Sequence, residues 1–177
     1  KIVHDPRLVW NTLDIIEKYQ GIAVQSQSGH SFIKDQMREH NAAYGGEMSA
    51  HHYFRDFAYC DSGMIPWLLV VSLLSETSQS LSSLVEDMIS HFPCSGEINF
   101  KVANTDQTIQ TLLDYYADQN PVIDRTDGIS LDFGTWRFNV RASNTEPLLR
   151  LNIESRLDRD HQPMQHYVDE LTALIQS

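Results

Sequence analysis

The order of strand-like and helix-like segments in the second half of the chain limits its fold more than any other feature. Asp127-Gly128 separates two strand-like runs, and this dipeptide strongly favours the turn of a β-hairpin. Helical periodicity extends over residues 106–119 and recurs near the end, where Met164 and Val168 are spaced four residues apart. The strand-like runs are 97–102, 122–126, 129–133, 136–140 and 148–153. This order predicts an α+β domain in which an antiparallel sheet is covered by two helices.

The first half of the chain alternates strands with helices. Its strand-like runs are 1–5, 22–24 and 42–46, and its helical segments are 10–19, 31–40, 61–76 and 81–89. Asp61 or Ser62 fits the N-cap of the third of these helices. Such alternation predicts an α/β layer domain, with a mixed sheet and flanking helices. Residues 92–96 have the composition of a linker, so we expect domains at 1–92 and 93–177.

Composition excludes several classes of function. The 177 residues include 13 basic and 24 acidic side chains, a net charge of −11, whereas general nucleic-acid binding needs a basic surface. There is no run of about 18 apolar residues and no signal-peptide pattern at the start. Cys60 and Cys94 make no disulfide framework and fit a reducing compartment. These features predict a cytoplasmic protein that binds neither nucleic acid nor membranes.

A polar segment between the last two strand-like runs has the composition of an anion-binding loop. It reads Arg-Ala-Ser-Asn-Thr-Glu-Pro at residues 141–147. A guanidinium can place two donors on the oxygens of one phosphate, and hydroxyls and backbone N–H groups can satisfy the remaining oxygens. From residue types alone, a polar hairpin loop that binds nothing fits equally well.

A second polar segment reads Gly-Gly-Glu-Met-Ser-Ala-His at residues 45–51. If it is extended, alternate side chains share a face, and Glu47, Ser49 and His51 point the same way. A carboxylate, a hydroxyl and an imidazole in a row suit the hydroxyls of a sugar ring. The two glycines would let the backbone turn sharply or approach a ligand closely. A polar loop with chance alternation is the other interpretation.

His51 and His52 also raise the question of a metal site, with Glu47 as a third ligand. Adjacent histidines point apart on helices and on strands, so they chelate one ion poorly, and their spacing matches no zinc signature. We therefore expect no metal site in this chain.

The two polar segments together resemble the α-D-phosphohexomutase family. Gly-Glu-Met-Ser-x-His, at residues 46–51, resembles its sugar-binding loop, and Arg-x-Ser-Asn-Thr-x-Pro, at residues 141–147, resembles its phosphate-binding loop. The likeness covers nearly the whole chain and is greatest to bacterial phosphomannomutases. It implies the third and fourth domains of the family, and the fourth domain is described as TATA-binding-protein-like.

The resemblance also implies roles for individual residues. Three of them would bind the sugar: Glu47, Ser49 and His51. Four would bind a phosphate: Arg141, Ser143, Asn144 and Thr145. Two would assist proton transfer or neutralise charge near the reacting oxygen: His30 and Arg7.

Two motifs of the family are missing from this sequence. These are the Thr-x-Ser-His-Asn-Pro loop, which carries the catalytic phosphoserine, and the Asp-Gly-Asp-x-Asp loop, which binds Mg²⁺. The run Ser90-His91-Phe92-Pro93 departs from the first motif and ends an amphipathic helical pattern, so we interpret it as a helix terminus. We therefore expect the carboxy-terminal half of a longer enzyme, without activity of its own.

The resemblance implies what the whole enzyme does. It would interconvert mannose 6-phosphate and mannose 1-phosphate through a phosphoserine and a hexose bisphosphate intermediate, and so supply GDP-mannose for surface polysaccharides. Mg²⁺, hexose 1,6-bisphosphate as activator and the amino-terminal domains would be its cofactors and partners. A phosphoglucomutase of the same family, a non-catalytic sugar-phosphate-binding module and a protein-interaction module that uses the open edge of the last sheet are the alternatives.

Overall fold

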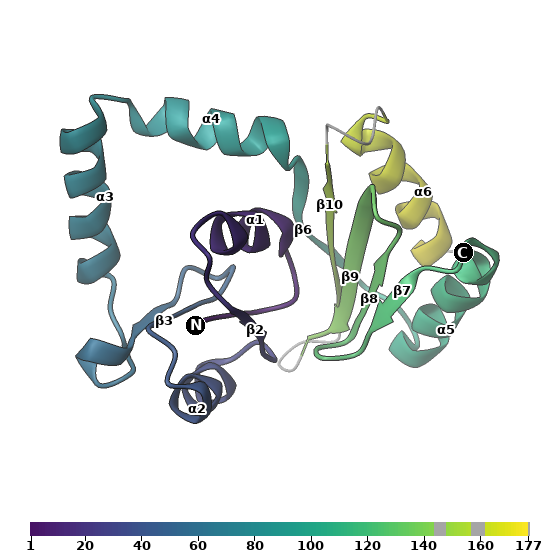
Figure 1. Cartoon of the computed structure of the whole chain (residues 1–177). Helices are drawn as coiled ribbons and strands as arrows, with labels where there is room; N and C mark the ends of the chain where they lie inside the picture. The colour runs from purple at the N-terminus through teal and green to yellow at the C-terminus, as the bar shows by residue number, and fades with distance from the viewer. Residues whose placement is uncertain (144–147, 157–161, 177) are drawn as a thin grey trace. The chain divides into compact units, whose positions relative to one another are not determined.

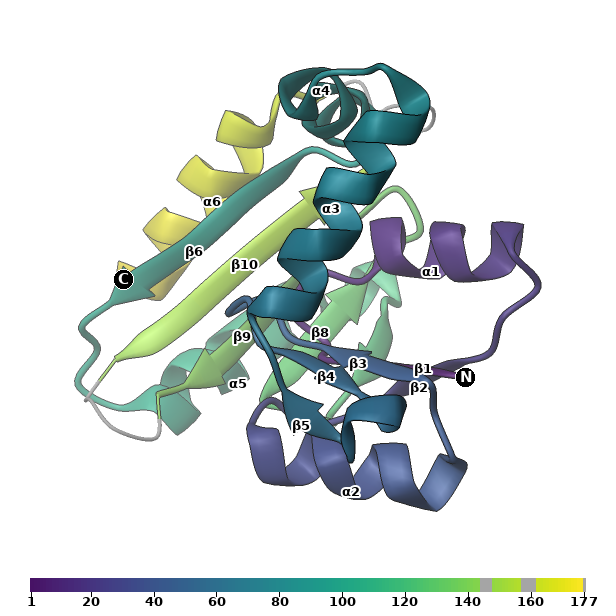
Figure 2. The same cartoon turned by 90° about the vertical axis from the view of Figure 1, so that its left-hand side faces the viewer.

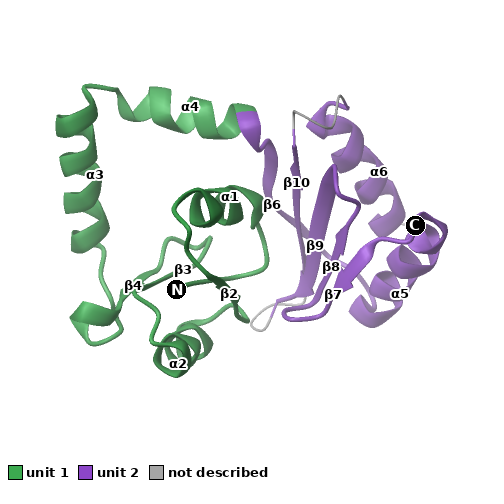
Figure 3. Ribbon diagram, viewed as in Figure 1, with its two compact units in different colours: residues 1–90 green, residues 91–177 purple. Residues whose placement is uncertain are grey.

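The computed structural model describes residues 1–143, 148–156 and 162–176. The chain divides into two compact units, Lys1–Ser90 and His91–Ser177 (Figure 3). Each unit has its own five-stranded sheet and its own cluster of buried hydrophobic side chains.

The first unit contains a mixed sheet with strand order β2-β1-β3-β4-β5. β1 pairs in parallel with β2 and β3, whereas β4 and β5 continue the sheet in antiparallel pairs. The strands are β1 (Ile2–His4), β2 (Ala23–Gln25), β3 (Tyr44–Gly46), β4 (His52–Phe54) and β5 (Cys60–Asp61). The helices are α1 (Trp10–Lys18), α2 (His30–His40), the 3-10 helix η1 (Arg55–Phe57), α3 (Met64–Thr77) and α4 (Leu81–His91). The predicted α/β layer fold is confirmed, although β4, η1 and β5 had no clear signal in the sequence.

Helices α1 and α2 lie on opposite faces of the three parallel strands (Figures 1 and 2). The core under α2 is small and consists of Val3, Ile33, Met37, Ala42 and Tyr53. A Cβ added to Gly45 would lie 2.7 Å from Met37 Sδ and 2.8 Å from Ile33 Cγ2. This glycine lets α2 approach β3, and it lies within a strand and not in a turn.

Helix α3 is apolar around its whole circumference, which is the pattern of an enclosed helix. None of its residues is buried, and Trp67, Leu68 and Leu69 are each more than half exposed. Within the described residues, no single helix has the length and composition to cross a membrane. α3 and α4 meet that criterion only when they are taken together, and they are bent by 96°.

Helix α4 ends at His91, as the sequence predicted for the run Ser90-His91-Phe92-Pro93. The next strand already begins at Cys94, so residues 94–96, predicted as a linker, belong to the sheet of the second unit. Ser95 contributes a side-chain contact there, because its Oγ accepts a 2.9 Å hydrogen bond from the Ile153 backbone at an irregularity of the ladder. A polar, glycine-containing segment was therefore mistaken for a connection.

The second unit contains an antiparallel sheet with strand order β6-β10-β9-β8-β7. Figure 1 shows two helices, α5 and α6, on one face of this sheet. The strands are β6 (Cys94–Phe100), β7 (Val122–Asp124), β8 (Ile129–Asp132), β9 (Trp136–Ala142) and β10 (Leu149–Ser155). The helices are α5 (Thr105–Tyr116), the 3-10 helix η2 (Ala117–Gln119) and α6 (Met164–Gln176). The predicted antiparallel sheet with two helices is confirmed.

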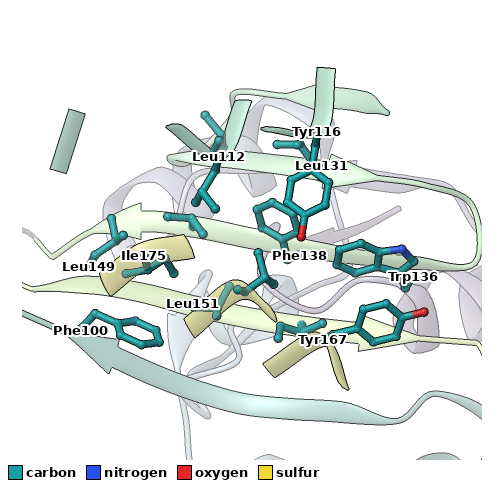
Figure 4. Close-up of a cluster of buried hydrophobic side chains, with 14 residues drawn as sticks. Phe100, Leu112, Tyr116, Leu131, Trp136, Phe138, Leu149, Leu151, Tyr167 and Ile175 are labelled. Carbon is teal, nitrogen blue, oxygen red and sulfur yellow. The ribbon is translucent and has the colours of Figure 1, made fainter. Parts of the chain in front are cut away.

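Alternation along β9 and β10 places the core of the second unit on the helical face of the sheet. Trp136, Phe138 and Val140 are buried there. Figure 4 shows Phe138 next to Tyr116 of α5 and Trp136 next to Tyr167 of α6. The side chains between them point to the other face, where Arg137 and Glu154 form a cross-strand ion pair at 2.6 Å. Apolar and polar residues thus alternate along the same strand.

Candidate functional site

Three polar segments of the first unit follow the carboxyl ends of its parallel strands. Arg7 comes after β1, His30 after β2 and Glu47 after β3. The carboxyl ends of parallel neighbours lie at one edge of a sheet, and open α/β sheets bind their ligands there. The fold therefore brings together three residues that are up to 40 positions apart in sequence.

Asp5 fixes Arg7 against the loop that contains Glu47. Asp5 Oδ1 accepts a 3.0 Å hydrogen bond from the backbone N–H of Arg7, and Oδ2 accepts from Arg7 Nε at 3.0 Å. The same Oδ2 also accepts a 2.8 Å hydrogen bond from the backbone N–H of Met48. Both Asp5 and Arg7 are buried. Asp5 therefore links the loop after β1 to the loop after β3.

The carboxylate of Glu47 links the same loop to the start of α2. Its Oε2 accepts a 2.7 Å hydrogen bond from the backbone N–H of Gly29, and its Oε1 accepts a 2.6 Å hydrogen bond from the hydroxyl of Tyr53. Each carboxylate oxygen has two lone pairs, so acceptor capacity remains for a ligand. Burial, together with the hydrogen bond to Glu47, raises the pKa of Tyr53 and keeps its hydroxyl protonated as the donor.

The loop between β3 and β4 is a turn and not an extended segment. The Glu47 backbone N–H donates to the carbonyl of His51 at 3.0 Å, and the Ala50 N–H donates to the carbonyl of Glu47 at 3.0 Å. Ala50 has a positive φ of 63°, in the left-handed region. The prediction that Glu47, Ser49 and His51 share a face because of strand alternation was therefore wrong in its geometry. Ser49 and His51 are exposed on this turn.

The two adjacent histidines contact different groups. His51 Nδ1 lies 2.7 Å from Asp61 Oδ2, whereas His52 Nδ1 lies 2.6 Å from the hydroxyl of Tyr44. In the ranges that the structure describes, no group of three His, Cys, Asp or Glu side chains is arranged to hold a metal ion. The implied Mg²⁺ therefore has no fitting set of ligands among these residues.

Asp61 was predicted as a possible helix cap but has another role. The N-cap position of α3 is Gly63, and the Ser62 Oγ accepts a hydrogen bond of 3.3 Å from the Ile65 N–H.

Sequence reasoning missed Asp5, Tyr53 and Asp61 as parts of the site. No local pattern identifies them, because each contacts the loop through strand pairing or a distant hydrogen bond.

The first turn of α2 borders the same edge of the sheet. Gly29 has a φ of 124°, which favours glycine, and the exposed His30 begins the helix. One turn later, Lys34 Nζ lies 5.8 Å from the centre of the Tyr53 ring. Cationic and imidazole groups thus accompany the backbone donors of the helix start.

In the second unit, Arg141 and Ser143 lie at the end of β9. Arg141 faces Arg150 in the register, and Glu97 approaches both guanidinium groups, at 3.8 Å and 3.5 Å respectively. Ser143 borders a hollow of about 390 Å³ whose other walls come from residues 102–105, Ala142 and Leu148. Asn144 and Thr145 lie outside the described residues. Of the four residues predicted to bind a phosphate, the described ones therefore supply one guanidinium, from Arg141, and one hydroxyl, from Ser143.

Comparison with known proteins agrees with this arrangement. Residues 1–92 match the family model of the phosphoglucomutase/phosphomannomutase alpha/beta/alpha domain III. Residues 97–171 match the model of the phosphoglucomutase/phosphomannomutase C-terminal domain. The two units thus match the third and the C-terminal domain of this family. The chain belongs to the phosphoglucomutase/phosphomannomutase family, as its two loops predicted.

Individual relatives support the same assignment. The chain is 61% identical to a protein described as phosphohexose mutases of Xanthomonas campestris, over 89% of this chain and 35% of the relative. It is 55% identical to a phosphomannomutase of Vibrio cholerae, over 99% of this chain and 38% of the relative. The chain therefore spans little more than a third of the length of these relatives.

A solved structure shares the fold. The phosphoglucomutase/phosphomannomutase family protein of Burkholderia thailandensis matches 99% of this chain and 37% of its own, with a TM-score of 0.75. The sequence identity is 22%, so this likeness concerns the fold alone.

Proposed function

We propose that this chain is the carboxy-terminal, substrate-recognising part of a phosphomannomutase that interconverts mannose 6-phosphate and mannose 1-phosphate. One observation carries the proposal. Asp5 and Glu47 tie three separate loops together at the carboxyl edge of the parallel strands, and these loops contain Arg7, His30 and the sugar-loop motif. Relatives described as phosphomannomutases support the choice of reaction.

The two domains would divide the recognition of the substrate. In residues 1–92, the hydroxyls of the sugar would be bound by Glu47, Ser49 and His51. In residues 93–177, the phosphate that is not reacting would be bound by Arg141, Ser143, Asn144 and Thr145. The chain has a net charge of −11, so local cations must overcome a repulsive surface field. The guanidinium of Arg141 is the cation best placed in the loop to do so.

Arg7 and His30 would act nearer to the reacting oxygen. Arg7 is held by Asp5, and a guanidinium fixed in this way can neutralise charge without reorganising. His30 would hold or transfer a proton at the hydroxyl oxygen. Phosphoryl transfer depends mainly on positioning and electrostatics, so these residues can matter without supplying the nucleophile.

The phosphoserine, the Mg²⁺ site and the bisphosphate activator belong, in this proposal, to the full-length cytoplasmic enzyme. Mg²⁺ would neutralise charge on the transferred phosphoryl group there. We therefore expect this chain to bind the substrate but not to turn it over. In a coupled assay with mannose 1-phosphate and a hexose 1,6-bisphosphate, turnover on the order of 10 per second would contradict this division of labour.

A binding experiment tests the recognition itself. The ¹⁵N-labelled chain is titrated with mannose 1-phosphate and, separately, with inorganic phosphate, and amide shifts are followed by NMR. Mannose 1-phosphate should shift the amides of Gly29, residues 47–51 and Ser143, whereas inorganic phosphate should shift only the Ser143 region. Glucose 1-phosphate in a parallel titration distinguishes a phosphoglucomutase. No shift in either loop with either sugar phosphate would refute the proposal.

Glu47→Gln tests the sugar loop, with Glu39→Gln as the matched control. Glu39 is an exposed glutamate of α2 whose Oε2 accepts a 3.2 Å hydrogen bond from Gln36, one helical turn earlier. Loss of a hydrogen bond to a charged group should weaken mannose 1-phosphate binding by about 1.5–3 kcal/mol for Glu47→Gln alone. Inorganic phosphate affinity should stay unchanged. Lower stability with unchanged sugar affinity would assign Glu47 a purely structural role.

A further inference from the structure

The carboxylate of Asp61 binds two successive residues where the sugar loop joins β4. Asp61 Oδ2 lies 2.7 Å from Nδ1 of His51, and Oδ1 accepts a 3.0 Å hydrogen bond from the backbone N–H of His52. Asp61 itself belongs to β5 and pairs with Tyr53 in the sheet. The carboxylate is therefore fixed both by strand pairing and by the backbone of the loop that it contacts.

The chemistry of this contact determines where the imidazole carries its proton. An ionised carboxylate only accepts hydrogen bonds, so the ring nitrogen that faces it must be the donor. Burial alone would raise the pKa of Asp61, but the hydrogen bonds from His51 and His52 and the nearby imidazoles outweigh burial and lower the pKa. Asp61 is thus ionised at neutral pH, and a neutral His51 has its single proton on Nδ1.

We propose that Asp61 is a positioning residue for His51. It would fix the neutral ring as the Nδ1–H tautomer and so present Nε2, at the opposite edge of the ring, as a hydrogen-bond acceptor for a sugar hydroxyl. The substrate half of this inference rests on the proposed function, in which His51 contacts the sugar. The tautomer half does not depend on the sugar, because it rests on the geometry of the pair and on the fact that an ionised carboxylate only accepts hydrogen bonds.

A fixed tautomer has a direct consequence for recognition. Without the carboxylate, a neutral imidazole distributes its proton over both nitrogens, and Nε2 would be a donor part of the time. With it, Nε2 accepts from the O–H of a hydroxyl, whose own oxygen stays available to other donors. This favours a free hydroxyl at that position of the substrate over a phosphorylated oxygen, which has no hydrogen to donate.

His51 and Asp61 are both exposed to solvent, and this determines which effect of their contact can be measured. The side chains of His51 and Asp61 are 53% and 40% exposed, so solvent screens their attraction and the pair adds little to stability. The centre of the His51 ring lies 6.4 Å from the centre of the Tyr53 ring, with an angle of 30° between the ring planes. Orientation and tautomer, and not the free energy of unfolding, are therefore the expected signatures.

The tautomer is tested by histidine ¹⁵N NMR of the whole chain at about pH 8, where ordinary histidines are neutral. Wild type should give the Nδ1–H pattern for His51, and Asp61→Ala should shift it towards Nε2–H. Asp61→Asn should retain the Nδ1–H pattern, because its side-chain carbonyl still accepts. Asp56→Ala is the matched control, since exposed Asp56 contacts Arg55 instead. An Nε2–H pattern in wild type, or no change in Asp61→Ala, would overturn the inference.

The role in recognition is tested by mannose 1-phosphate affinity in a double-mutant cycle. Asp61→Ala should weaken binding about fivefold and Asp61→Asn less than about twofold, the size expected for misorienting one hydrogen bond. In the His51→Ala background, Asp61→Ala should have no further effect, and inorganic phosphate binding should be unchanged throughout. A persistent effect without His51 would refute the positioning role. An unchanged affinity in His51→Ala would remove His51 from the proposed sugar site and with it the substrate half, while the tautomer result stands separately.

Discussion

The hydroxyl of Tyr53 donates a 2.6 Å hydrogen bond to Oε1 of Glu47. Tyr53 is fully buried in β4, where it pairs with Gly45, whereas Glu47 lies in the turn beyond β3. The phenol ring fills the core under α2, and its polar end reaches the functional edge of the sheet. The core of the first unit is therefore linked directly to the loop at residues 47–51, the proposed sugar-binding loop.

Tyr53→Phe should lower the free energy of unfolding of the first unit by about 1.5–3 kcal/mol. The substitution removes a hydrogen bond to a charged acceptor but keeps the buried ring. Tyr19→Phe is the control, because Tyr19 is 75% exposed, and it should change stability by no more than about 0.5 kcal/mol. Urea denaturation measures both variants. Equal effects would mean that the hydroxyl of Tyr53 is hydrated in solution.

The same pair predicts a pH dependence in the alkaline range. Burial, then the hydrogen bond and the charge of Glu47, raise the pKa of Tyr53 above its ordinary value of 10.0. The folded state therefore favours the neutral phenol. Its contribution is fully present below pH 10 and is lost as the pH rises further, by up to about 1.4 kcal/mol per pH unit.

Urea titrations of wild type and Tyr53→Phe from about pH 8 to about pH 11 measure this loss. The stability difference between them should be constant up to pH 10 and should shrink above it. Tyr116, whose pKa burial and Glu170 also raise, is present in both proteins and cancels. A difference that stays constant through the whole range would contradict the raised pKa.

Met37→Ala should lower the free energy of unfolding much more than Met64→Ala does. Met37 is fully buried in α2, and its Sδ packs onto Gly45, so truncation should cost about 2–5 kcal/mol through lost burial and a cavity. Met64 begins α3 and is 65% exposed, so its truncation should cost no more than about 0.5 kcal/mol. Thermal or urea unfolding of the two variants and of wild type measures both losses of stability. A large cost at Met64 would show that α3 is enclosed in solution.

Gly128→Ala should destabilise the second unit more than Gly134→Ala does. Both glycines have positive φ values, 68° and 84°, which should cost an alanine about 1–2 kcal/mol. An added Cβ at Gly134 meets nothing within 4 Å, whereas at Gly128 it would overlap the Val140 carbonyl and lie 2.7 Å from Arg141 Cα. This overlap should add about 1–3 kcal/mol, measurable by urea denaturation. Equal losses would mean that the β7–β8 loop can move away from β9.

Arg141→Ala should weaken inorganic phosphate binding by about 1.5–3 kcal/mol if the loop after β9 is the phosphate site. Arg125→Ala is the control, because Arg125 is an exposed arginine of the β7–β8 loop and removes the same charge from the same unit. Isothermal titration calorimetry at fixed salt compares the two. Equal weakening would indicate a diffuse electrostatic effect and not a site at Arg141.

Local periodicity made much of the second unit predictable. Along β9, the apolar residues Trp136, Phe138 and Val140 alternate with polar ones, so only one face of the strand belongs to the hydrophobic core. The helix α6 was predicted in the same way, from apolar residues that lie one helical turn apart. The family was also predicted from the sequence, because the motifs of the two loops resemble those of the α-D-phosphohexomutases.

What the sequence by itself determined about this protein is therefore its helices and most of its strands, the faces of those strands and the chemistry of its loops. The tertiary structure alone decided the shape of the loop at residues 47–51, because the pairing of Gly46 with His52 bends these residues into a turn. It also decided the partners of the loop. Asp5 contacts Met48, 43 residues further along the chain, and Asp61 contacts His51, 10 residues earlier. Neither contact produces a periodic pattern in the sequence. Periodicity records forces between near neighbours in the chain, whereas these contacts depend on which distant strands become neighbours in the sheet.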